Sequence, residues 1–256
     1  QGRWDEAEAV ISDFLADLPD SILIETSVAM LQRKQALPPI VSGPAEGAAE
    51  AMSGVARALS REGNSAIALL LVQWSLALRS DDPPTLLLLG QIMEDQGRLD
   101  DALAAFDRIS SDSPYSWLAR LSRAQVLERD DRIDEAVVLL KTMIAERPER
   151  SDAAHTLGDL LRVNERFREA VGAYDDAVER VGEITSRHWR LLYTRGIALE
   201  RSKQWERAEA DFLTALDLQP DQPSVLNYLG YSWVELGVNL TRARQMIEKA
   251  VEQRPR

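Results

Sequence analysis

Small residues recur along the chain at a nearly constant interval, and a larger apolar residue follows each of them three positions later. The small residues are Ala56, Gly90, Ala124, Gly158, Gly196 and Gly230. Successive members are 34 residues apart, except for one step of 38 between Gly158 and Gly196. Apolar residues three or four positions apart share one face of an α-helix. The pattern therefore predicts a helix around each small residue.

The small residues listed above form a first column, that is, a set of equivalent positions in successive intervals. A second column of small residues predicts a second helix in every interval. It consists of Ala68, Ala102, Ala136, Ala170, Ala208 and Ala243, each with a bulky apolar or aromatic residue four positions later in all six copies. Gly63, Gly97 and Gly237 lie between the columns, where a left-handed residue ends the first helix. We expect an antiparallel helix pair whose small columns mark its closest approach, because larger side chains there would push the backbones apart. Leucine at Gly230 is therefore expected to destabilise the chain.

The composition indicates that the whole protein is helical. Ala, Leu, Arg and Glu dominate the 256 residues, and these are strong helix formers. Runs of β-branched or aromatic residues with a period of two are few. A hydrophobic content of 45% is enough for a sizeable core. We therefore predict an all-α fold.

Charge and residue content exclude several functions. The net charge of -12 disfavours nucleic acid as a partner, because binding it requires a basic surface. The chain has no Cys and two His residues, so we expect no metal site and no cofactor. No apolar run approaches the roughly 18 residues of a membrane span. A glycine-rich phosphate loop and a nucleophile–histidine–carboxylate set are also absent from the sequence, so we expect no enzymatic activity.

A period of 34 with these two columns resembles the tetratricopeptide repeat (TPR). The best copies run from Leu86 to Pro114 and from Leu226 to Pro255. The resemblance implies a right-handed superhelical solenoid of antiparallel helix pairs. Six repeats are expected in residues 49–256, starting near 49, 83, 117, 151, 189 and 223. Because one helix pair cannot bury its apolar face alone, neighbouring repeats must stack.

The first 48 residues depart from this regular pattern. Residues 2–19 have the spacing of the second half of a repeat, and residues 21–36 predict one further helix. We interpret residues 1–36 as a truncated N-terminal repeat and expect the chain to be a piece of a longer protein. Residues 37–48 are rich in Pro and Gly, which predicts a linker. The alternative is that this segment packs along the solenoid or inside its groove.

In the TPR family, the first helix of each repeat lines a concave groove that binds partners. The resemblance therefore implies the following partner-binding residues here: Leu87, Gln91, Leu121, Gln125, His155, Asp159, Tyr193, Asn227, Tyr228 and Tyr231. This mixture suits a protein or peptide partner. Asn227 is the strongest candidate for a binding residue among them, because its amide can pair with a peptide backbone. Alternatively, Tyr228 and Tyr231 pack against a following helix, and His155 is a solvated or locally bonded residue.

Other residues are expected to serve the structure. We assign packing roles to Trp74, Trp117, Trp189, Trp205 and Trp233. The pairs Asp81–Asp82, Asp130–Asp131 and Asp175–Asp176 are interpreted as helix caps and solvated charge. The carboxylate clamp of chaperone-binding TPR domains is not matched, since its inner positions hold Ser53, Leu87, Leu121, His155 and Tyr193.

These features predict a non-catalytic scaffold or adaptor that binds a protein or peptide. The copies resemble those of exported or lipid-anchored proteobacterial TPR proteins, some of which act as adaptors for a periplasmic processing protease. That resemblance favours a periplasmic or outer-membrane-associated location over a cytoplasmic one. The alternative function is the substrate-recruiting helical arm of a larger enzyme, such as a repeat-containing glycosyltransferase. The sequence leaves open the partner, the oligomeric state and whether the groove or residues 37–48 are the main binding element.

Overall fold

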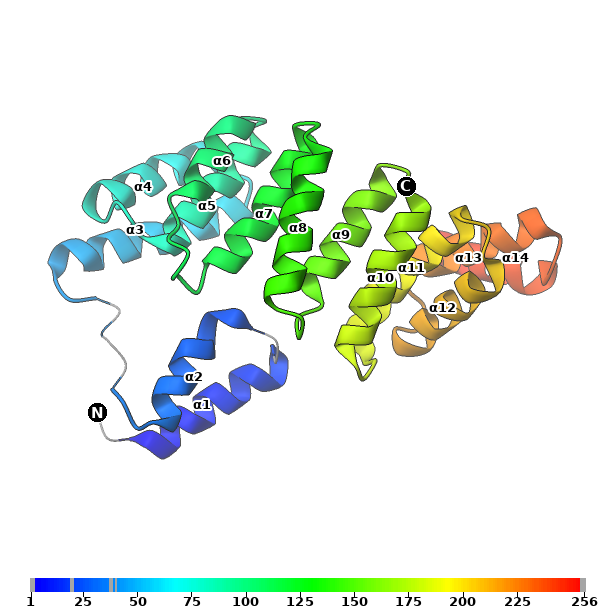
Figure 1. The fold of residues 1–256 in the computed structure, drawn as a ribbon, viewed down its shortest axis with the longest axis horizontal. Helices are drawn as coiled ribbons and strands as arrows, with labels where there is room; N and C mark the ends of the chain where they lie inside the picture. Colours follow the sequence, from blue (N-terminus) through cyan, green and yellow to red (C-terminus); the bar gives the residue numbers. More distant parts are fainter. Residues whose placement is uncertain (1–2, 19–20, 37–38, 40, 254–256) are drawn as a thin grey trace. The chain divides into compact units, whose positions relative to one another are not determined.

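The computed structural model describes residues 3–18, 21–36, 39 and 41–253 (Figure 1). In this part of the chain, all regular elements are α-helices or short 3-10 helices, which confirms the predicted all-α fold. The chain divides into two compact units, residues 1–132 and residues 133–256, which are described separately below.

Unit 1 contains an N-terminal helical segment followed by successive helices of the repeats. Its elements are α1 (Trp4–Asp17), the 3-10 helix η1 (Ile22–Ile24), α2 (Glu25–Gln32), α3 (Pro44–Arg61), α4 (Ser65–Leu78), α5 (Pro83–Asp95), α6 (Leu99–Asp107) and α7 (Ser116–Arg129). Each of α3 and α5 packs against the helix that follows it, and α4 also packs against α5. The repeats therefore stack on one another within the unit.

Unit 2 also consists of successive helices of the repeats. Its elements are α8 (Ile133–Glu146), α9 (Asp152–Val163), α10 (Phe167–Val181), the 3-10 helix η2 (Ser186–His188), α11 (Trp189–Arg201), α12 (Trp205–Leu218), α13 (Pro223–Leu236) and α14 (Leu240–Gln253). The closest pairs are α9 with α10, α11 with α12, and α13 with α14. The four residues that lengthen the step before Gly196 are accommodated by the longer α10 and by η2.

The two small columns lie where the paired helices meet. All six alanines of the second column are fully buried, with an exposed fraction of 0%. A Cβ atom added at Gly90 would lie 2.2 Å from the ring of Phe106, and one at Gly158 would lie 2.5 Å from the ring of Tyr174. In these two repeats the bulky residue four positions after the alanine thus covers the glycine of the first helix, which confirms the predicted close approach there.

The N-terminal elements begin and end elsewhere than predicted. Helix α3 starts at Pro44, inside the predicted linker, because proline fits the first turn of a helix. The predicted helix at residues 21–36 starts instead as η1, and α2 ends at Gln32. Lys34, with a φ of 52°, adopts the left-handed conformation that ends it. Within residues 37–48, positions 37, 38 and 40 lie outside the described residues.

The turn between the helices of a repeat uses one left-handed residue. Gly63, Gly97 and Gly237 have φ values of 82°, 72° and 70°, as predicted. The same position is occupied without glycine by Asp131, Glu165 and Lys203, whose φ values are 59°, 58° and 66°. The turn is therefore determined by the packing of the two helices rather than by glycine alone.

Replacing Lys203 with glycine is expected to raise the free energy of unfolding. A side chain in the left-handed region costs about 1–2 kcal/mol, and the greater freedom of glycine in the unfolded chain offsets part of this. We expect a net stabilisation of about 0.5–1 kcal/mol in chemical denaturation. Lys203→Ala keeps the Cβ atom and should give no such gain. Equal stabilities of the glycine and alanine variants would contradict the prediction.

The tryptophans divide between packing and surface positions. Trp117 and Trp233 are buried, as predicted, and Trp189 and Trp205 are half-buried. The prediction for Trp74 is wrong, because 51% of this residue is exposed on α4.

Among the aspartates predicted to be helix caps, Asp82 is one, since its Oδ2 atom accepts a hydrogen bond of 3.1 Å from the Thr85 amide.

Candidate functional site

The first helices of the unit 2 repeats carry an aromatic cluster. Tyr193 on α11 and Tyr228 on α13 meet edge to face, with ring centroids 6.1 Å apart. Both rings also contact Phe212 of α12, at 6.2 Å and 5.3 Å respectively. Edge-to-face packing at such distances is favourable for aromatic rings. Two residues predicted for the groove are thus brought together across neighbouring repeats.

The hydroxyl group of Tyr228 is held by a carboxylate. It donates a hydrogen bond of 3.0 Å to Oε2 of Glu200 on α11. Burial raises the pKa of Tyr228, and the charge of Glu200 raises it further. Tyr228 is half-buried and packs against α11 and α12. The orientation of the Tyr228 ring is therefore fixed by side chains of α11 and α12.

A second cluster surrounds the predicted residues His155 and Asp159 of α9. The hydroxyl group of Tyr174 donates a hydrogen bond of 2.7 Å to Oδ1 of Asp159. Nε of Arg162 donates a hydrogen bond of 3.1 Å to the Tyr174 oxygen. The ring of His155 lies 6.0 Å from that of Tyr174, and its Nε2 atom lies 3.6 Å from Oδ2 of Asp159. Burial raises the pKa of Tyr174, and Asp159 raises it further.

Titration of His155 is expected to make folding depend on pH. Burial lowers the pKa of His155, an effect that the charge of Asp159 opposes and those of Arg190 and Arg162 support. In the unfolded chain histidine takes up a proton at about pH 6.5, whereas folded His155 stays neutral to lower pH. The unfolded state then binds more protons, so stability present above about pH 6.5 is lost as the pH falls below it.

The prediction is tested with His155→Gln, which does not titrate. Its free energy of unfolding, measured between about pH 7 and pH 5, should fall less steeply with decreasing pH than that of the wild type. Parallel curves for the two proteins would exclude His155 as the source of the dependence.

Two predicted residues of α13 present their side chains to solvent. Asn227 is exposed, and Tyr231, one turn further along the helix, is 54% exposed. Residues four positions apart on a helix lie on the same face. Asn227 and Tyr231 thus extend the face that contains Tyr228, and they are the accessible members of the predicted set on this helix.

Unit 1 contains a separate cavity of about 290 Å³ on its first helices. Leu87 and Gln91 of α5 line it, together with Arg57 and Arg61 of α3. Leu23 of η1 lines the same cavity, so part of this face is occupied by the chain itself. Other predicted residues of unit 1 lie on α7 outside the cavity lining: Leu121 is half-buried and Gln125 is exposed.

Sequence reasoning missed two residues that organise the unit 2 face, Glu200 and Tyr174. Glu200 follows the predicted groove residue Tyr193 by seven positions, or two helical turns, on α11, so the helical period could have placed it on the same face. Tyr174 occupies a column otherwise filled by Val, Phe, Leu and Ile. A tyrosine at a core position was the available signal, because a buried hydroxyl group requires a partner.

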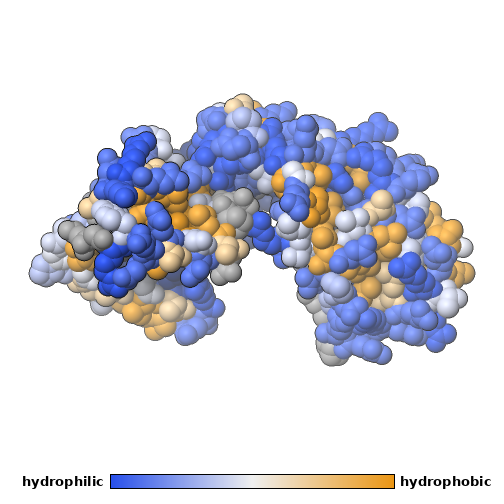
Figure 2. All heavy atoms as spheres, turned by 90° about the horizontal axis from the view of Figure 1, so that it is seen from below, coloured by the Kyte–Doolittle hydropathy of each residue, from blue (hydrophilic) through white to orange (hydrophobic). Residues whose placement is uncertain are grey.

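Hydrophobic and hydrophilic residues alternate over the described surface. On the face drawn in Figure 2, the hydrophobic residues gather in patches among hydrophilic ones.

Among the described residues, we find no group of three His, Asp or Glu side chains placed to hold a metal ion. None of the helices in the described ranges is both long and apolar enough to cross a membrane.

Comparison with family models matches most of the repeat region to one family. The family model described as Tetratricopeptide repeat matches residues 55–116, 87–151, 155–223 and 193–256. TPR repeat-containing protein PA4667 of Pseudomonas aeruginosa is 26% identical over 168 residues, which are 65% of this chain and 28% of that protein. General transcriptional corepressor ssn6 of Schizosaccharomyces pombe is 26% identical over 133 residues, 52% of this chain and 12% of the relative. The chain thus spans less than a third of the length of either curated relative.

Solved structures show the same fold at low identity. The crystal structure of the APC/C hetero-tetramer Cut9–Hcn1 matches with a TM-score of 0.62 and 14% identity, covering 81% of this chain and 40% of that chain. MamA from Desulfovibrio magneticus RS-1 (residues 41 to the end) matches with a TM-score of 0.54 and 20% identity, covering 71% and 99% respectively. These likenesses support a fold of stacked helix pairs.

Proposed function

Because the chain belongs to the tetratricopeptide repeat family, we propose that it is a non-catalytic scaffold that binds a peptide segment of a partner protein on the first helices of unit 2. Tetratricopeptide repeats generally serve protein interaction, and stacked repeats offer extended binding surfaces.

One observation carries the proposal: accessible amide and aromatic groups lie on a face that is otherwise fixed. Tyr193 and Tyr228 are held by ring contacts, and Tyr228 is also held by its hydrogen bond to Glu200. Beside them, Asn227 and Tyr231 are exposed. An asparagine amide can pair with both the N–H and the C=O groups of a peptide. An exposed tyrosine offers a large contact area at low entropic cost.

The proposal favours unit 2 over unit 1 as the main site. In unit 1, Leu23 of the chain itself lines the cavity that holds Leu87 and Gln91. A partner would have to displace that segment or bind beside it. In unit 2, Asn227 and Tyr231 are accessible without such a change. The ligand that fits them is an extended segment with an apolar or aromatic side chain to set against Tyr231.

We further propose a specific role for this scaffold, as an adaptor for a protease or an assembly complex of the bacterial envelope. Its location would then be the periplasm or the outer membrane. It is supported by the resemblance of the Asn227–Tyr231 repeat to exported bacterial repeats and by the similarity to the Pseudomonas aeruginosa protein. Fractionation of cells producing the tagged native protein tests the location. Recovery in the cytoplasm alone would contradict it.

The binding proposal is tested with the double variant Asn227→Ala, Tyr231→Ala. Peptides selected on the wild type from a random display library should bind the variant at least about tenfold more weakly, because two contact groups are removed. The free energy of unfolding should change by less than about 0.5 kcal/mol per position, because both side chains are exposed.

The matched control is Thr214→Ala, a truncation at an exposed position of α12 whose hydroxyl group bonds only to its own helix, at the Ala210 carbonyl. It should leave peptide binding unchanged. Equal affinities of the wild type and the double variant would rule out this face as the binding site.

A further inference from the structure

One cavity of unit 2 gathers positive charge, although the chain as a whole is acidic. This turn cavity has a volume of about 390 Å³ and lies beside the turns that join α9 to α10 and α11 to α12. Four positive and two negative side chains line it, in a chain whose net charge is -12. They are Arg166, Arg168, Arg201, Lys203, Glu165 and Glu169. The turn cavity is therefore locally positive.

Part of this positive charge is not neutralised by neighbouring carboxylates. Arg166 pairs with Glu169, since its Nη2 atom lies 2.7 Å from Oε2 of that residue. The side chains of Arg168 and Lys203, in contrast, form no hydrogen bond or ion pair within the described residues. Both residues are exposed. They are therefore available to an anionic ligand.

Arg201 adds a third positive group, which lies over an aromatic ring. Its Cζ atom is 4.8 Å from the centre of the Phe167 ring, a distance at which a guanidinium group is attracted to the ring face. A stacked guanidinium group keeps its N–H groups at the edge of its plane, where a carboxylate can accept two of them at once. Arg201 is also exposed, and it makes no ion pair in the described part of the chain. Phe167 thus orients a group that can still bind a carboxylate.

The position of Arg168 has a different character in the other repeats. It is the second residue of its helix, where the other repeats have Ala66, Asp100, Asp134, Glu206 and Thr241. The helix dipole stabilises a carboxylate near the start of a helix and destabilises a positive charge there. The fold therefore favours an acidic residue at this position, and Arg168 departs from that preference at a cost in stability.

Lys203 also occupies a position that is unfavourable for its side chain. Its φ of 66° lies in the left-handed region, which costs stability in a residue that has a Cβ atom. The equivalent turn positions of the other repeats hold glycine or an acidic residue: Gly63, Gly97, Asp131, Glu165 and Gly237. Unfavourable conformations of this kind cluster at functional sites. Two positions of the turn cavity thus carry a positive charge that the fold does not require.

We propose that the turn cavity binds an acidic segment of a partner protein, whose Asp or Glu carboxylates are held by Arg168, Arg201 and Lys203. Carboxylates form short, charge-assisted hydrogen bonds with such donors. The lining of the cavity includes neither Asn227 nor Tyr231. The site is therefore additional to the peptide site proposed above and does not depend on it.

Charge and exposure select this occupant over other anions. A nucleic acid or an anionic membrane extends beyond the cavity and meets a chain of net charge -12, which repels it. A small molecule fits poorly, because ligand pockets enclose most of their ligand and the three available positive residues are exposed. These residues belong to two successive repeats, which suits separate carboxylates along a segment better than one phosphate group.

Fluorescence anisotropy with a labelled hexaglutamate peptide tests the proposal on the whole chain. The wild type should bind the peptide, and binding should weaken as the salt concentration rises from about 50 mM to about 500 mM, because salt screens exposed charges. Hexaglutamine, which has the same length without the charge, should not bind. Since the net charge of the protein repels acidic peptides in general, binding indicates a locally positive site.

Two variants locate the site without endangering the fold. Arg168→Asp and Lys203→Gly introduce residues that other repeats carry at these positions, so both variants should fold. We expect Arg168→Asp to weaken binding about tenfold and Lys203→Gly about threefold. The matched control is Arg244→Asp on α14, which changes the net charge as Arg168→Asp does. The Arg244 side chain is 79% exposed and lies outside the cavity lining, so this variant should bind like the wild type.

The outcomes separate the turn cavity from the peptide site. The double variant Asn227→Ala, Tyr231→Ala should bind hexaglutamate like the wild type, and loss of binding in it would place the acidic peptide on the wrong face. A wild type that does not bind hexaglutamate would overturn the proposal, as would equal affinities of the wild type and Arg168→Asp. Inorganic phosphate that displaces the peptide at lower concentrations than glutarate does would assign the cavity to phosphate groups and overturn the choice of carboxylates.

Discussion

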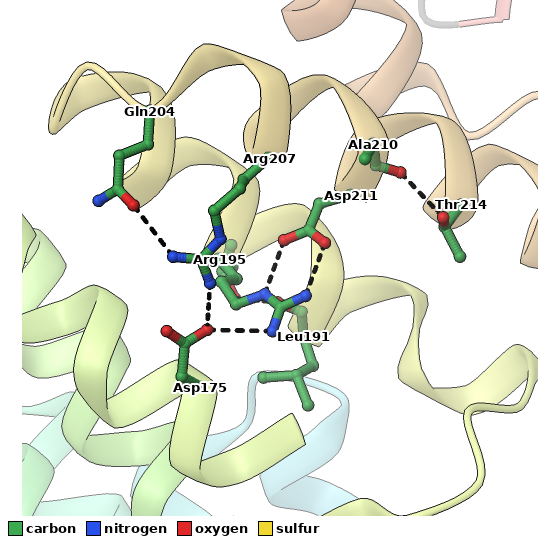
Figure 3. Close-up of polar contacts among 9 residues, drawn as sticks. Asp175, Leu191, Arg195, Gln204, Arg207, Ala210, Asp211 and Thr214 are labelled. Carbon is green, nitrogen blue, oxygen red and sulfur yellow. Dashed lines mark hydrogen bonds and ion pairs between the residues drawn. The ribbon is translucent and has the colours of Figure 1, made fainter. Parts of the chain in front are cut away.

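Replacing Arg195 with alanine is expected to lower the free energy of unfolding of unit 2 by about 3–5 kcal/mol. The Arg195 side chain is 15% exposed, and its Nε and Nη2 atoms donate hydrogen bonds of 2.7 Å to both carboxylate oxygens of Asp211, which is 9% exposed. The Nη1 atom also donates to Oδ1 of Asp175, at 3.2 Å (Figure 3). Removing the guanidinium group leaves Asp211 buried without its partner, and this is the main cost.

The position of this ion pair explains its effect. Arg195 on α11 and Asp211 on α12 belong to one repeat, and Asp175 lies on α10 of the preceding repeat, so the contact of Arg195 with Asp175 links the two repeats. Arg207 also donates a hydrogen bond of 2.7 Å to Asp175, but its side chain is 48% exposed.

Chemical denaturation of the variants tests the role of Arg195. Arg207→Ala should cost no more than about 1 kcal/mol, as is usual for exposed ion pairs. The double variant Arg195→Met, Asp211→Leu should recover most of the stability, because no buried charge remains. Equal losses for Arg195→Ala and Arg207→Ala would show that burial does not determine the effect.

Replacing Gly230 with leucine is the second large expected effect, with a destabilisation of about 1–3 kcal/mol. A Cβ atom at this position would lie 2.8 Å from Cγ1 of Ile247 and 3.1 Å from the carbonyl oxygen of Ala243. The oxygen belongs to the backbone of α14, so the two helices must move apart. This cost exceeds the roughly 1 kcal/mol that leucine gains over glycine in helix propensity.

Gly172 on α10 provides the matched control, because a Cβ atom there would meet nothing within 4 Å. The same substitution at this exposed glycine should stabilise the chain by about 0.5–1 kcal/mol through propensity alone. Thermal or chemical denaturation of both variants should therefore give changes of opposite sign. Destabilisation of both would show that close helix approach is not the reason for glycine at position 230.

The fold was largely predictable, because helix pairing depends on local patterns that repeat. The two columns of small residues, which include Gly90 and Ala102, identify the helices and the line along which they meet. Both residues are buried. The start of α3 at Pro44 was not predictable from proline content, since the same residue can break a helix or begin one.

Side-chain clusters were harder to foresee, because their members are far apart in the sequence. We expected Asp175 to be a cap or a solvated charge, yet it binds Arg195 and Arg207, 20 and 32 residues away. Tyr228 lies 28 residues from its partner Glu200. The helical register places each residue on a face, but only the stacking of repeats determines which side chains meet. The exposure of Trp74 was missed for the same reason.

The most direct test of peptide binding on unit 2 uses photo-cross-linking. Because the chain lacks cysteine, a single cysteine introduced by Val234→Cys or by Thr214→Cys can carry a photoreactive label, and each labelled protein is irradiated with a peptide selected on the wild type. Val234 is exposed one turn after Tyr231 on α13, so this label leaves Asn227 and Tyr231 in place, and we expect a cross-linked product from position 234 and none above background from position 214 on α12. Cross-linking from position 214 alone, or equally from both, would contradict binding on the first helices of the repeats.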